Sequence, residues 1–466
     1  MSARGAKRLA LWLLGGVGVL VAGTIAAFVI AGDWTPEPPP KLAWTKGATW
    51  FTGPLTPDGS LDWTAAVKAE AVAAGWREER DGGAALDEAL RLLTGVEETI
   101  RLLPGRGSDF SLSANLDDGL QTIRSGNFDL ATAALVLPWL DHCAPVFERA
   151  RVAAATGQLW VGTGDDGTMV HVDPYSRRFS ALDDLIKALA CHAVERGLRG
   201  ETAAARESAV TAWRLASLVP YPASALDQGR RVTRQATCLE LLLNGGGARE
   251  ALPVHELFPL FDSPPDRLDG EAAMLEALRL ERWQATMQLI HVQQRVKASD
   301  DIEAGDMTTA MVVFARADPN PLFRRLQAEF DRLEQQLALP EVPLAARFDA
   351  VLARLEELEG QHRPVPPQRD GPLGRLLVSD REWIDRFFVL YVASRAQGLE
   401  WGLVQWLHAV TRRDSLLAEA AARANAPERR DSLLGEPLMA RQQADGSWQV
   451  SGALIELAKR YGLEEK

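Results

Sequence analysis

Apolar side chains recur with a helical period along most of this 466-residue chain. Residues three, four and seven apart share one face of an α-helix, so each such stripe marks a helix with one buried face. Leu86, Leu90 and Leu93 form one stripe, and residues 135–150 carry another. Three later stripes are Leu275, Leu278 and Trp283; Leu322, Leu326, Phe330, Leu333 and Leu337; and Leu344, Phe348, Val351, Leu355 and Leu358. The pattern predicts a mainly α fold, in which the last two stripes form an antiparallel helical hairpin.

The clearest periodic region follows Ser180. Its apolar stripe comprises Leu182, Leu185, Ile186, Leu189 and Ala193. Ser180 is the predicted N-cap, with Asp183 in the capping-box position three residues later. Glycines between residues 197 and 200 end this helix, and further helices are predicted at 201–219 and 224–243.

The first two of these helices partly match the 34-residue tetratricopeptide repeat. With Gly197 at the turn glycine, the small, aromatic and proline positions of the repeat fall on Ala209, Trp213, Ala216 and Pro220. Gly200 departs from the repeat, which has tyrosine there, and no clean second copy follows. We therefore expect a tetratricopeptide-like helical pair that stacks on its neighbours as a short irregular solenoid.

The C-terminal region combines a long helix with a hairpin. The predicted helix covers residues 380–420, and its aromatic side chains are expected in the core: Trp383, Phe387, Phe388, Tyr391, Trp401 and Trp406. Two short runs further on flank Asp445-Gly446, a strong signal for a β-hairpin.

Residues 158–179 form the segment without helical periodicity. Its glycines and the pair Asp165-Asp166 indicate a turn, and the short apolar runs around them predict either a small hairpin or a long loop. A calcium loop would need acidic residues at alternating positions and a terminal Glu, which this stretch does not supply. His171 and Asp173 are its best polar pair, although alternation along a strand is the commoner cause of such spacing.

The N-terminus carries an apolar segment long enough to span a bilayer. Residues 9–31 contain no charged side chain, and 23 residues at ~1.5 Å each can cross a ~30 Å hydrocarbon core. Arg4, Lys7 and Arg8 precede the segment and Asp33 is the first charge after it, which predicts a cytoplasmic N-terminus and an exported remainder. The alternative is a signal peptide cleaved at the end of the segment, but the apolar core of such a peptide is usually ~7–15 residues. We therefore expect a retained single-pass anchor in the cell membrane.

These patterns divide the chain into consecutive regions. The predicted regions are a cytoplasmic tail (1–8), the transmembrane anchor (9–31), a Pro- and Trp-rich linker (32–60), an α-helical domain (61–362), a Pro-rich linker (363–379) and a C-terminal helix and hairpin region (380–466). Consecutive prolines favour polyproline II, so the first linker is predicted to hold the domain away from the membrane.

Charge narrows the range of partners. The chain carries a net charge of −12, and the three basic residues before the anchor leave about −15 for the predicted exported part. This balance disfavours nucleic acid, whose binding depends on neutralising phosphates, and it equally disfavours peripheral binding to anionic lipid. Cys143, Cys191 and Cys238 lie within apolar helical patterns and are predicted to be buried, while a bridge between two of them stays open in an oxidising compartment.

The sequence contains no recognisable catalytic constellation. The seven histidines are scattered singly, and the zinc-protease His pair, the nucleophile elbow and the phosphate-binding loop are absent from the sequence. Adjacent residues on a helix point ~100° apart, which prevents Cys191-His192 or His142-Cys143 from pairing. His255-Glu256 is typical of a helix start. The acidic pairs are typical of solvated helix faces: Asp117-Asp118, Asp183-Asp184 and Glu356-Glu357. We therefore predict no catalytic, cofactor-binding or metal-binding residues and no cofactor.

Two blocks carry a resemblance to other proteins. Residues 179–218 combine an apolar helix, a Gly-acid turn and an alanine-rich second helix. Residues 431–438, followed by Arg441 and Asp445-Gly446, look like an Asp-Pro-Phe-x-Gly-x-Pro-Leu…Asp-Gly hairpin, with Ser432 and Leu433 in place of its proline and phenylalanine. In these blocks the chain resembles a group of uncharacterised bacterial membrane-anchored α-helical proteins. The resemblance implies structure and no activity or ligand.

Together these features predict a membrane-anchored helical scaffold that binds protein partners on the periplasmic or other extracytoplasmic side and is not an enzyme. Stacked helical pairs present concave surfaces suited to extended peptides or partner helices. One alternative is a secretion or envelope-assembly subunit whose anchor packs in a bundle through Gly18, Ala22 and Ala26. The other is a hydrolase with its site in residues 158–179.

Overall fold

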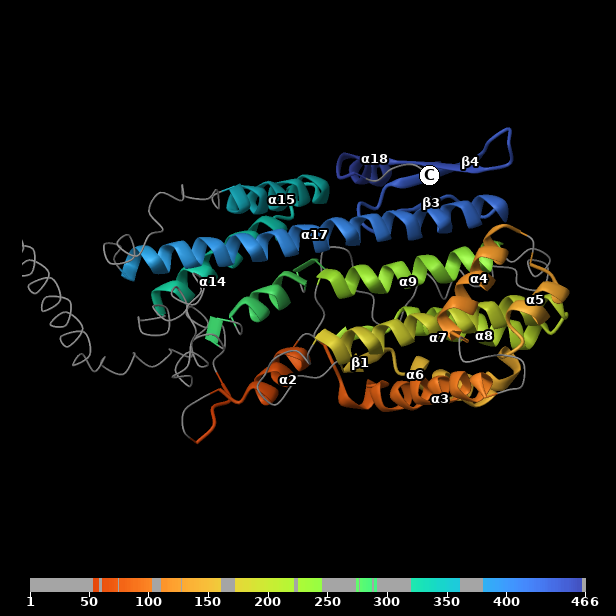
Figure 1. Ribbon diagram of the computed structural model, residues 1–466. Coiled ribbons are helices and arrows are strands. Elements are labelled where there is room, and N and C mark those ends of the chain that lie inside the picture. The colour runs from red at the N-terminus through yellow and green to blue at the C-terminus, as the bar shows by residue number, and fades with distance from the viewer. Residues whose placement is uncertain are drawn as a thin grey trace, which may run out of the picture.

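Helices make up most of the computed structural model (Figure 1). The structure describes residues 53–57, 61–73, 75–102, 110–126, 128–160, 172–221, 225–244, 274–275, 277–286, 289–290, 320–360 and 380–462. The predicted anchor and the predicted linker at 363–379 lie outside these ranges. Within them, no helix is both long enough and apolar enough to cross a membrane.

Helices also make up the first part of the chain. They are α2 (Trp63–Ala73), η1 (Glu78–Arg80), α3 (Gly83–Arg101), α4 (Leu112–Arg124), α5 (Leu130–Val136), η2 (Leu140–Cys143) and α6 (Ala144–Ala154). The predicted stripe of Leu86, Leu90 and Leu93 is buried on α3, which confirms that prediction. The stripe predicted over residues 135–150 is instead divided between α5, η2 and α6. Helix α5 stops before Pro138 because proline has no N–H to continue the helical hydrogen bonds.

The helical pair predicted from the repeat comparison is present as α7 (Val172–Leu198) and α8 (Thr202–Ala216). Gly200 between them has φ +78°, a left-handed conformation that favours glycine. The predicted N-cap at Ser180 is wrong, because α7 begins eight residues earlier and contains Ser180. Pro174 falls in the first turn of α7, where a missing N–H costs the helix nothing. Asp183, placed in the capping box by the prediction, instead pairs with Arg234.

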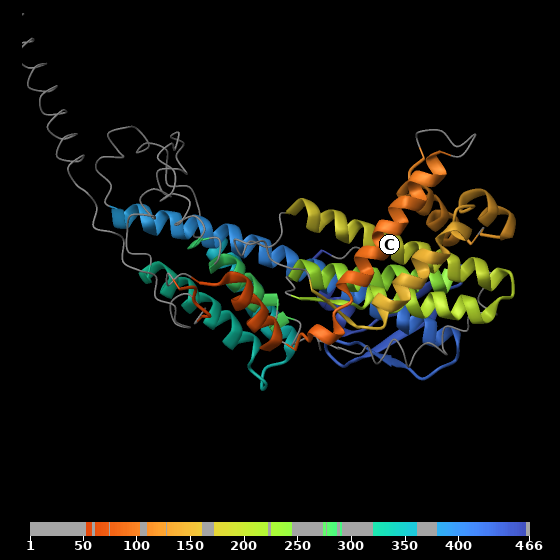
Figure 2. The same cartoon turned by 90° about the horizontal axis from the view of Figure 1, so that it is seen from below.

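Two long helices connect the two ends of the molecule. Helix α9 (Ala225–Asn244) agrees closely with its predicted range, and α17 (Asp380–Arg423) runs alongside it, as Figure 1 shows. Helices α14 (Asn320–Leu337) and α15 (Leu344–Gly360) form the predicted helical hairpin and pack on the first half of α17. Figure 2 shows α2 beside this hairpin, with α3 to α8 at the other end. The regions before and after the predicted second linker therefore share one helical body.

The core consists of two main apolar clusters. One collects side chains from α3 to α8 and includes Leu239 of α9 and Leu417 of α17. The other is built on α14 and α15 and includes Val232 of α9 and Leu403 of α17. Because the same two helices contribute to both clusters, they hold the two ends of the structure in a fixed relation.

Two small sheets complete the described fold. Strand β1 (Gln158–Trp160) pairs in parallel with β2 (Val219–Tyr221), so its partner lies about 60 residues away rather than in a local hairpin. The predicted hairpin at Asp445-Gly446 is confirmed: β4 (Pro437–Gln442) pairs antiparallel with β5 (Trp448–Ser451), and β3 (Arg429–Arg430) pairs with β4. Helix α18 (Ala453–Arg460) follows and packs on α17.

The prediction that Trp401 lies in the core is wrong. Trp406 is 3% exposed, as expected for the core, whereas Trp401 is 55% exposed. Five residues are about 1.4 helical turns, so the two rings lie on different faces of the helix. The other four predicted aromatics lie in a part of α17 whose side chains are not described. Cys143, Cys191 and Cys238 are all buried and free, so no bridge joins them.

Candidate functional site

The segment at 158–179, where the alternative hydrolase interpretation places a site, is only partly described. Residues 158–160 form β1, while His171, Asp165 and Asp166 lie outside the described residues. Asp173 belongs to the first turn of α7, so it does not lie on a strand. The described residues therefore neither support nor contradict the alternative in which His171 and Asp173 form a functional pair.

The two Cys–His neighbours separate as their helical spacing requires. Cys191 is buried in the core of α7, and His192 turns toward a pocket between helices. Cys143 is likewise buried, whereas His142 is exposed. Burial raises the pKa of each of these two thiols to about 12, so neither is a thiolate at neutral pH. His255-Glu256 lies outside the described residues.

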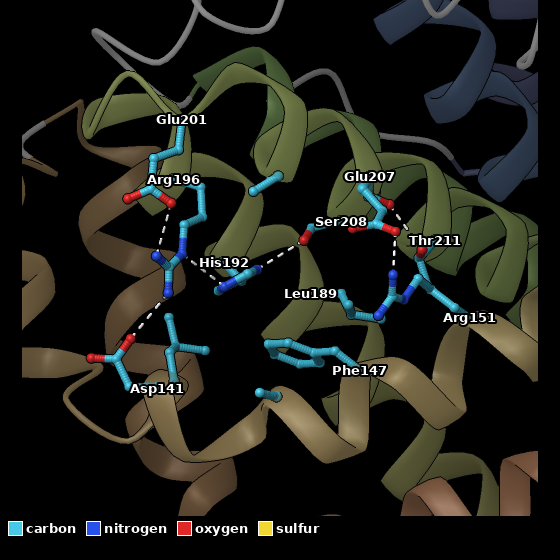
Figure 3. Close-up of a pocket in the computed structure, with 13 residues that line it drawn as sticks. Asp141, Phe147, Arg151, Leu189, His192, Arg196, Glu201, Glu207, Ser208 and Thr211 are labelled. Carbon is cyan, nitrogen blue, oxygen red and sulfur yellow. Dashed lines mark hydrogen bonds and ion pairs between the residues drawn. The ribbon is translucent and has the colours of Figure 1, made fainter.

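A pocket of about 230 Å³ opens between α6, α7 and α8 (Figure 3). We call it the α6–α8 pocket. Its apolar lining residues are Leu140, Ala144, Phe147, Leu189 and Ala204, and its polar ones are Asp141, Arg151, His192, Arg196, Glu201, Glu207, Ser208 and Thr211. Most of these residues come from the predicted helical pair, and the remainder come from η2 and α6. A floor of this mixed character is typical of sites that bind small polar–apolar groups.

The geometry at His192 fixes where its proton lies. Arg196 Nε donates to His192 Nε2 over 3.0 Å, and His192 Nδ1 lies 2.8 Å from Ser208 Oγ. Guanidinium nitrogens only donate, so Nε2 is the acceptor and Nδ1 carries the proton. His192 therefore donates to Ser208. Burial and then the charge of Arg196 lower the pKa of His192 to about 4, so the ring is neutral at pH 7.

This tautomer does not suit nucleophilic catalysis. A base that activates serine must present an unprotonated nitrogen to the hydroxyl and must itself be held by a carboxylate or a carbonyl. Here the nitrogen facing Ser208 carries the proton, and an arginine occupies the position of the carboxylate. This arrangement consequently leaves the Ser208 hydroxyl without an activating base.

Two groups of ion pairs flank the His192–Ser208 pair, as Figure 3 shows. On one side Arg196 contacts Asp141 at 3.1 Å and Glu201 at 2.9 Å. On the other side Arg151 of α6 pairs with Glu207 of α8. The side chain of Arg196 is 22% exposed, compared with 67% for Asp141 and 44% for Glu201. The carboxylates therefore face solvent more than the guanidinium group that they neutralise.

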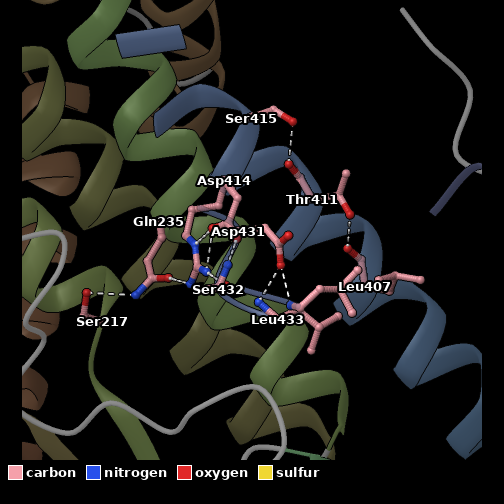
Figure 4. A network of polar contacts seen from close by, with 11 residues as sticks. Ser217, Gln235, Leu407, Thr411, Asp414, Ser415, Asp431, Ser432 and Leu433 are labelled. Atoms are coloured by element: carbon pink, nitrogen blue, oxygen red, sulfur yellow. Dashed lines mark hydrogen bonds and ion pairs between the residues drawn. The ribbon is translucent and has the colours of Figure 1, made fainter. Parts of the chain in front are cut away.

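A second polar network lies where the C-terminal block meets α17 (Figure 4). The Asp414 carboxylate accepts the N–H of Ser432 at 2.7 Å and also pairs with Arg413. Arg413 donates to Gln235 of α9 over 3.2 Å, and Gln235 donates to Ser217 over 3.0 Å. These contacts join the end of the chain to α17, α9 and the end of α8.

Asp431 organises the turn that begins this C-terminal block. Its carboxylate accepts the N–H groups of Leu433 at 3.0 Å, of Leu434, and of Glu436 at 3.2 Å. Burial raises its pKa, although the three donors act in the opposite direction. Every polar group named here is used within the fold, so this network is structural. It gives the Asp431–Leu438 motif of the sequence a physical role.

The α6–α8 pocket was not predicted from the sequence. One local signal was present, because His192 and Arg196 are one helical turn apart and must share a face. The contacts of Ser208, Glu207 and Arg151 depend on how three helices pack, which no local spacing reveals.

Comparison with known proteins adds no assignment. In the described part of the chain, no group of three or more His, Cys, Asp or Glu side chains is placed to hold a metal ion. No protein-family model, curated protein or solved structure matches the chain.

Proposed function

We propose that this protein is a membrane-anchored helical scaffold whose exported domain binds a protein partner at the α6–α8 pocket. The observation that carries the proposal is the pocket itself: about 230 Å³, with a floor of mixed apolar and polar residues between two groups of ion pairs. It lies on the α7–α8 pair, the part of the chain that resembles a tetratricopeptide unit, and such pairs present their grooves to peptides.

The chemistry of the pocket supports binding over catalysis. His192 is neutral and donates to Ser208, so no general base faces a nucleophile. Arg196 is engaged at all three of its nitrogens, by His192, Glu201 and Asp141. A site whose charged groups are already paired within the fold is suited to recognition by shape and charge.

The packing beneath the pocket supports a rigid recognition surface. Leu189 is 1% exposed and Trp213 is 2% exposed. Both belong to the apolar cluster that also contains side chains of α3 and α9. Groups held on closely packed helices bind with little loss of conformational entropy, which favours affinity.

The membrane part of the proposal rests on the sequence of residues 9–31. Reporter fusions at the C-terminus test it: a reporter that works only outside the cytoplasm should be active, and a cytoplasmic reporter should be inactive. A mature N-terminus at Gly32 would contradict the retained anchor.

Site-specific photo-crosslinking tests the binding site in the full chain. A photoreactive residue at Ala204, which lines the pocket, should give a discrete crosslinked protein in the cells that make this chain. The same residue at Ala203 is the matched control, because Ala203 is exposed one position away on α8 and does not line the pocket. Equal products from both positions, or none from Ala204, would contradict a partner at this site.

A further inference from the structure

We propose that the α6–α8 pocket receives the side chain of a lysine or arginine residue of the partner. This inference rests on the proposed function and specifies the chemistry of the ligand. It follows from the charge at the mouth of the pocket, its partly apolar walls and the hydroxyl hydrogen of Ser208, which is available to donate.

The charge at the mouth favours a cation. Asp141, Glu201 and Glu207 contribute three carboxylates, whereas Arg151 and Arg196 contribute two guanidinium groups. Since His192 is neutral, the lining carries one net negative charge. The three carboxylates are 44–67% exposed, compared with 22% for Arg196 and 44% for Arg151, so an incoming ligand meets more acidic than basic groups first. The net charge of −12 on the whole chain adds attraction in the same direction.

The walls fit the aliphatic stem of a basic side chain. Leu140, Ala144 and Phe147 line one side, and the Phe147 and His192 ring centroids are 4.8 Å apart. Lysine and arginine bury their methylene groups against such surfaces while the charged end remains near water or carboxylates. A neutral aromatic face also attracts a cation, and His192 adds no repulsion while it is unprotonated.

Ser208 provides a polar contact for the ligand backbone. Its oxygen accepts the proton of His192 Nδ1, so its own hydroxyl hydrogen is available to donate. Among the hydrogen bonds of the described residues, the neighbouring Thr211 donates to the Glu207 carbonyl at 2.8 Å, but no such bond joins the Ser208 hydroxyl to its own helix. A carbonyl of the bound peptide can therefore accept from Ser208.

An anionic ligand fits the pocket poorly. Each arm of Arg196 already meets His192, Glu201 or Asp141, and Arg151 is held by Glu207. An incoming carboxylate would have to displace one of these acids and leave it facing like charge.

Peptide binding to the full chain in non-ionic detergent tests the inference. The probes are fluorescent peptides of small neutral residues with lysine, arginine, norleucine or glutamate at the centre, followed by anisotropy. The lysine and arginine peptides should bind about fivefold more tightly than the norleucine peptide, and the difference should shrink at high salt. Equal affinity for lysine and norleucine, or preference for glutamate, would overturn the inference.

Substitutions at two exposed residues should change the affinity for the lysine peptide in opposite directions. Glu207→Gln should weaken the lysine peptide about threefold, because it removes one carboxylate from the mouth. Arg151→Gln should strengthen it by a similar factor, because Glu207 is then free to meet the ligand. An anion site predicts weaker binding for Arg151→Gln, and unchanged binding in both variants would also overturn the inference.

The crosslinking result separates the two proposals. A partner captured at Ala204 and not at Ala203, combined with no preference for the basic peptides, would leave the partner site standing and remove the cationic ligand. A preference for the basic peptides that Glu207→Gln does not reduce would place their binding elsewhere on the acidic surface.

Discussion

Trp213 provides the sharpest test of the helical packing. Its side chain is 2% exposed on α8 and belongs to the larger apolar cluster. A tryptophan buries ~150–250 Å² of surface, worth ~4–6 kcal/mol at ~25 cal/mol per Å², and some of this is retained by alanine. Trp213→Ala should therefore lower the free energy of unfolding by ~3–5 kcal/mol. This is a large share of the ~5–15 kcal/mol that stabilises a typical domain.

Trp401 is the matched control for this substitution. It is 55% exposed on α17, so Trp401→Ala removes the same atoms but leaves no closed cavity, and the loss should stay below ~2 kcal/mol. Both variants of the full chain would be unfolded with urea in non-ionic detergent and followed by far-ultraviolet circular dichroism. If Trp213→Ala does not fold, Trp213→Phe should fold and unfold between it and the parent. Equal urea midpoints for Trp213→Ala and Trp401→Ala would refute the packing argument.

Three further predictions follow from the same contacts. The pKa of His192 is lowered in the folded state to about 4. The stability that neutral His192 contributes is therefore fully present above the unfolded pKa of ~6.5 and is lost as the pH falls toward 4. His192→Gln, which does not titrate, should reduce the loss of stability between pH 7 and pH 5 by about 2 kcal/mol, and an unchanged pH profile would contradict this. Asp414→Asn should cost ~2–3 kcal/mol and speed proteolysis of the C-terminal block, because the Asp414 carboxylate is buried with Arg413 and the Ser432 N–H. Asp445→Asn, in an exposed hairpin turn, should leave both properties nearly unchanged, and similar effects of the two variants would argue against the network. Iodoacetamide should label Cys143, Cys191 and Cys238 only after denaturation, because burial raises the pKa of each thiol to about 12; rapid labelling of the folded chain, seen by mass spectrometry, would show that the packing is open.

Only one part of the candidate site was visible in the sequence. Helical spacing placed His192 away from Cys191, and the structure confirms that separation. The role of His192 as a donor to Ser208 depends on α7 packing against α8 and on Arg196 reaching the other ring nitrogen. Neither condition can be derived from periodicity, because the helix register that aligns the two side chains is a tertiary property.

The C-terminal block gives a similar contrast. Asp445-Gly446 predicted its hairpin because glycine readily adopts the left-handed conformation that such a turn needs, and Gly446 has φ +85°. The attachment of Ser432 to Asp414 and through Arg413 to Gln235 joins groups from three distant parts of the chain. The sequence motif alone gave no indication of these contacts with α17 and α9.

The sequence by itself determined the helices, the glycine turns between them and the C-terminal hairpin, because each depends on residues only a few positions apart. The stripes on α3, α14 and α15 are examples: burial of one face is enough to specify a helix. The tertiary structure decided the features that join distant residues. These include the parallel pairing of β1 with β2, the outward position of Trp401 and the α6–α8 pocket. Local patterns specify which face of a helix is apolar, but the neighbour that covers this face is selected by the packing of the whole chain.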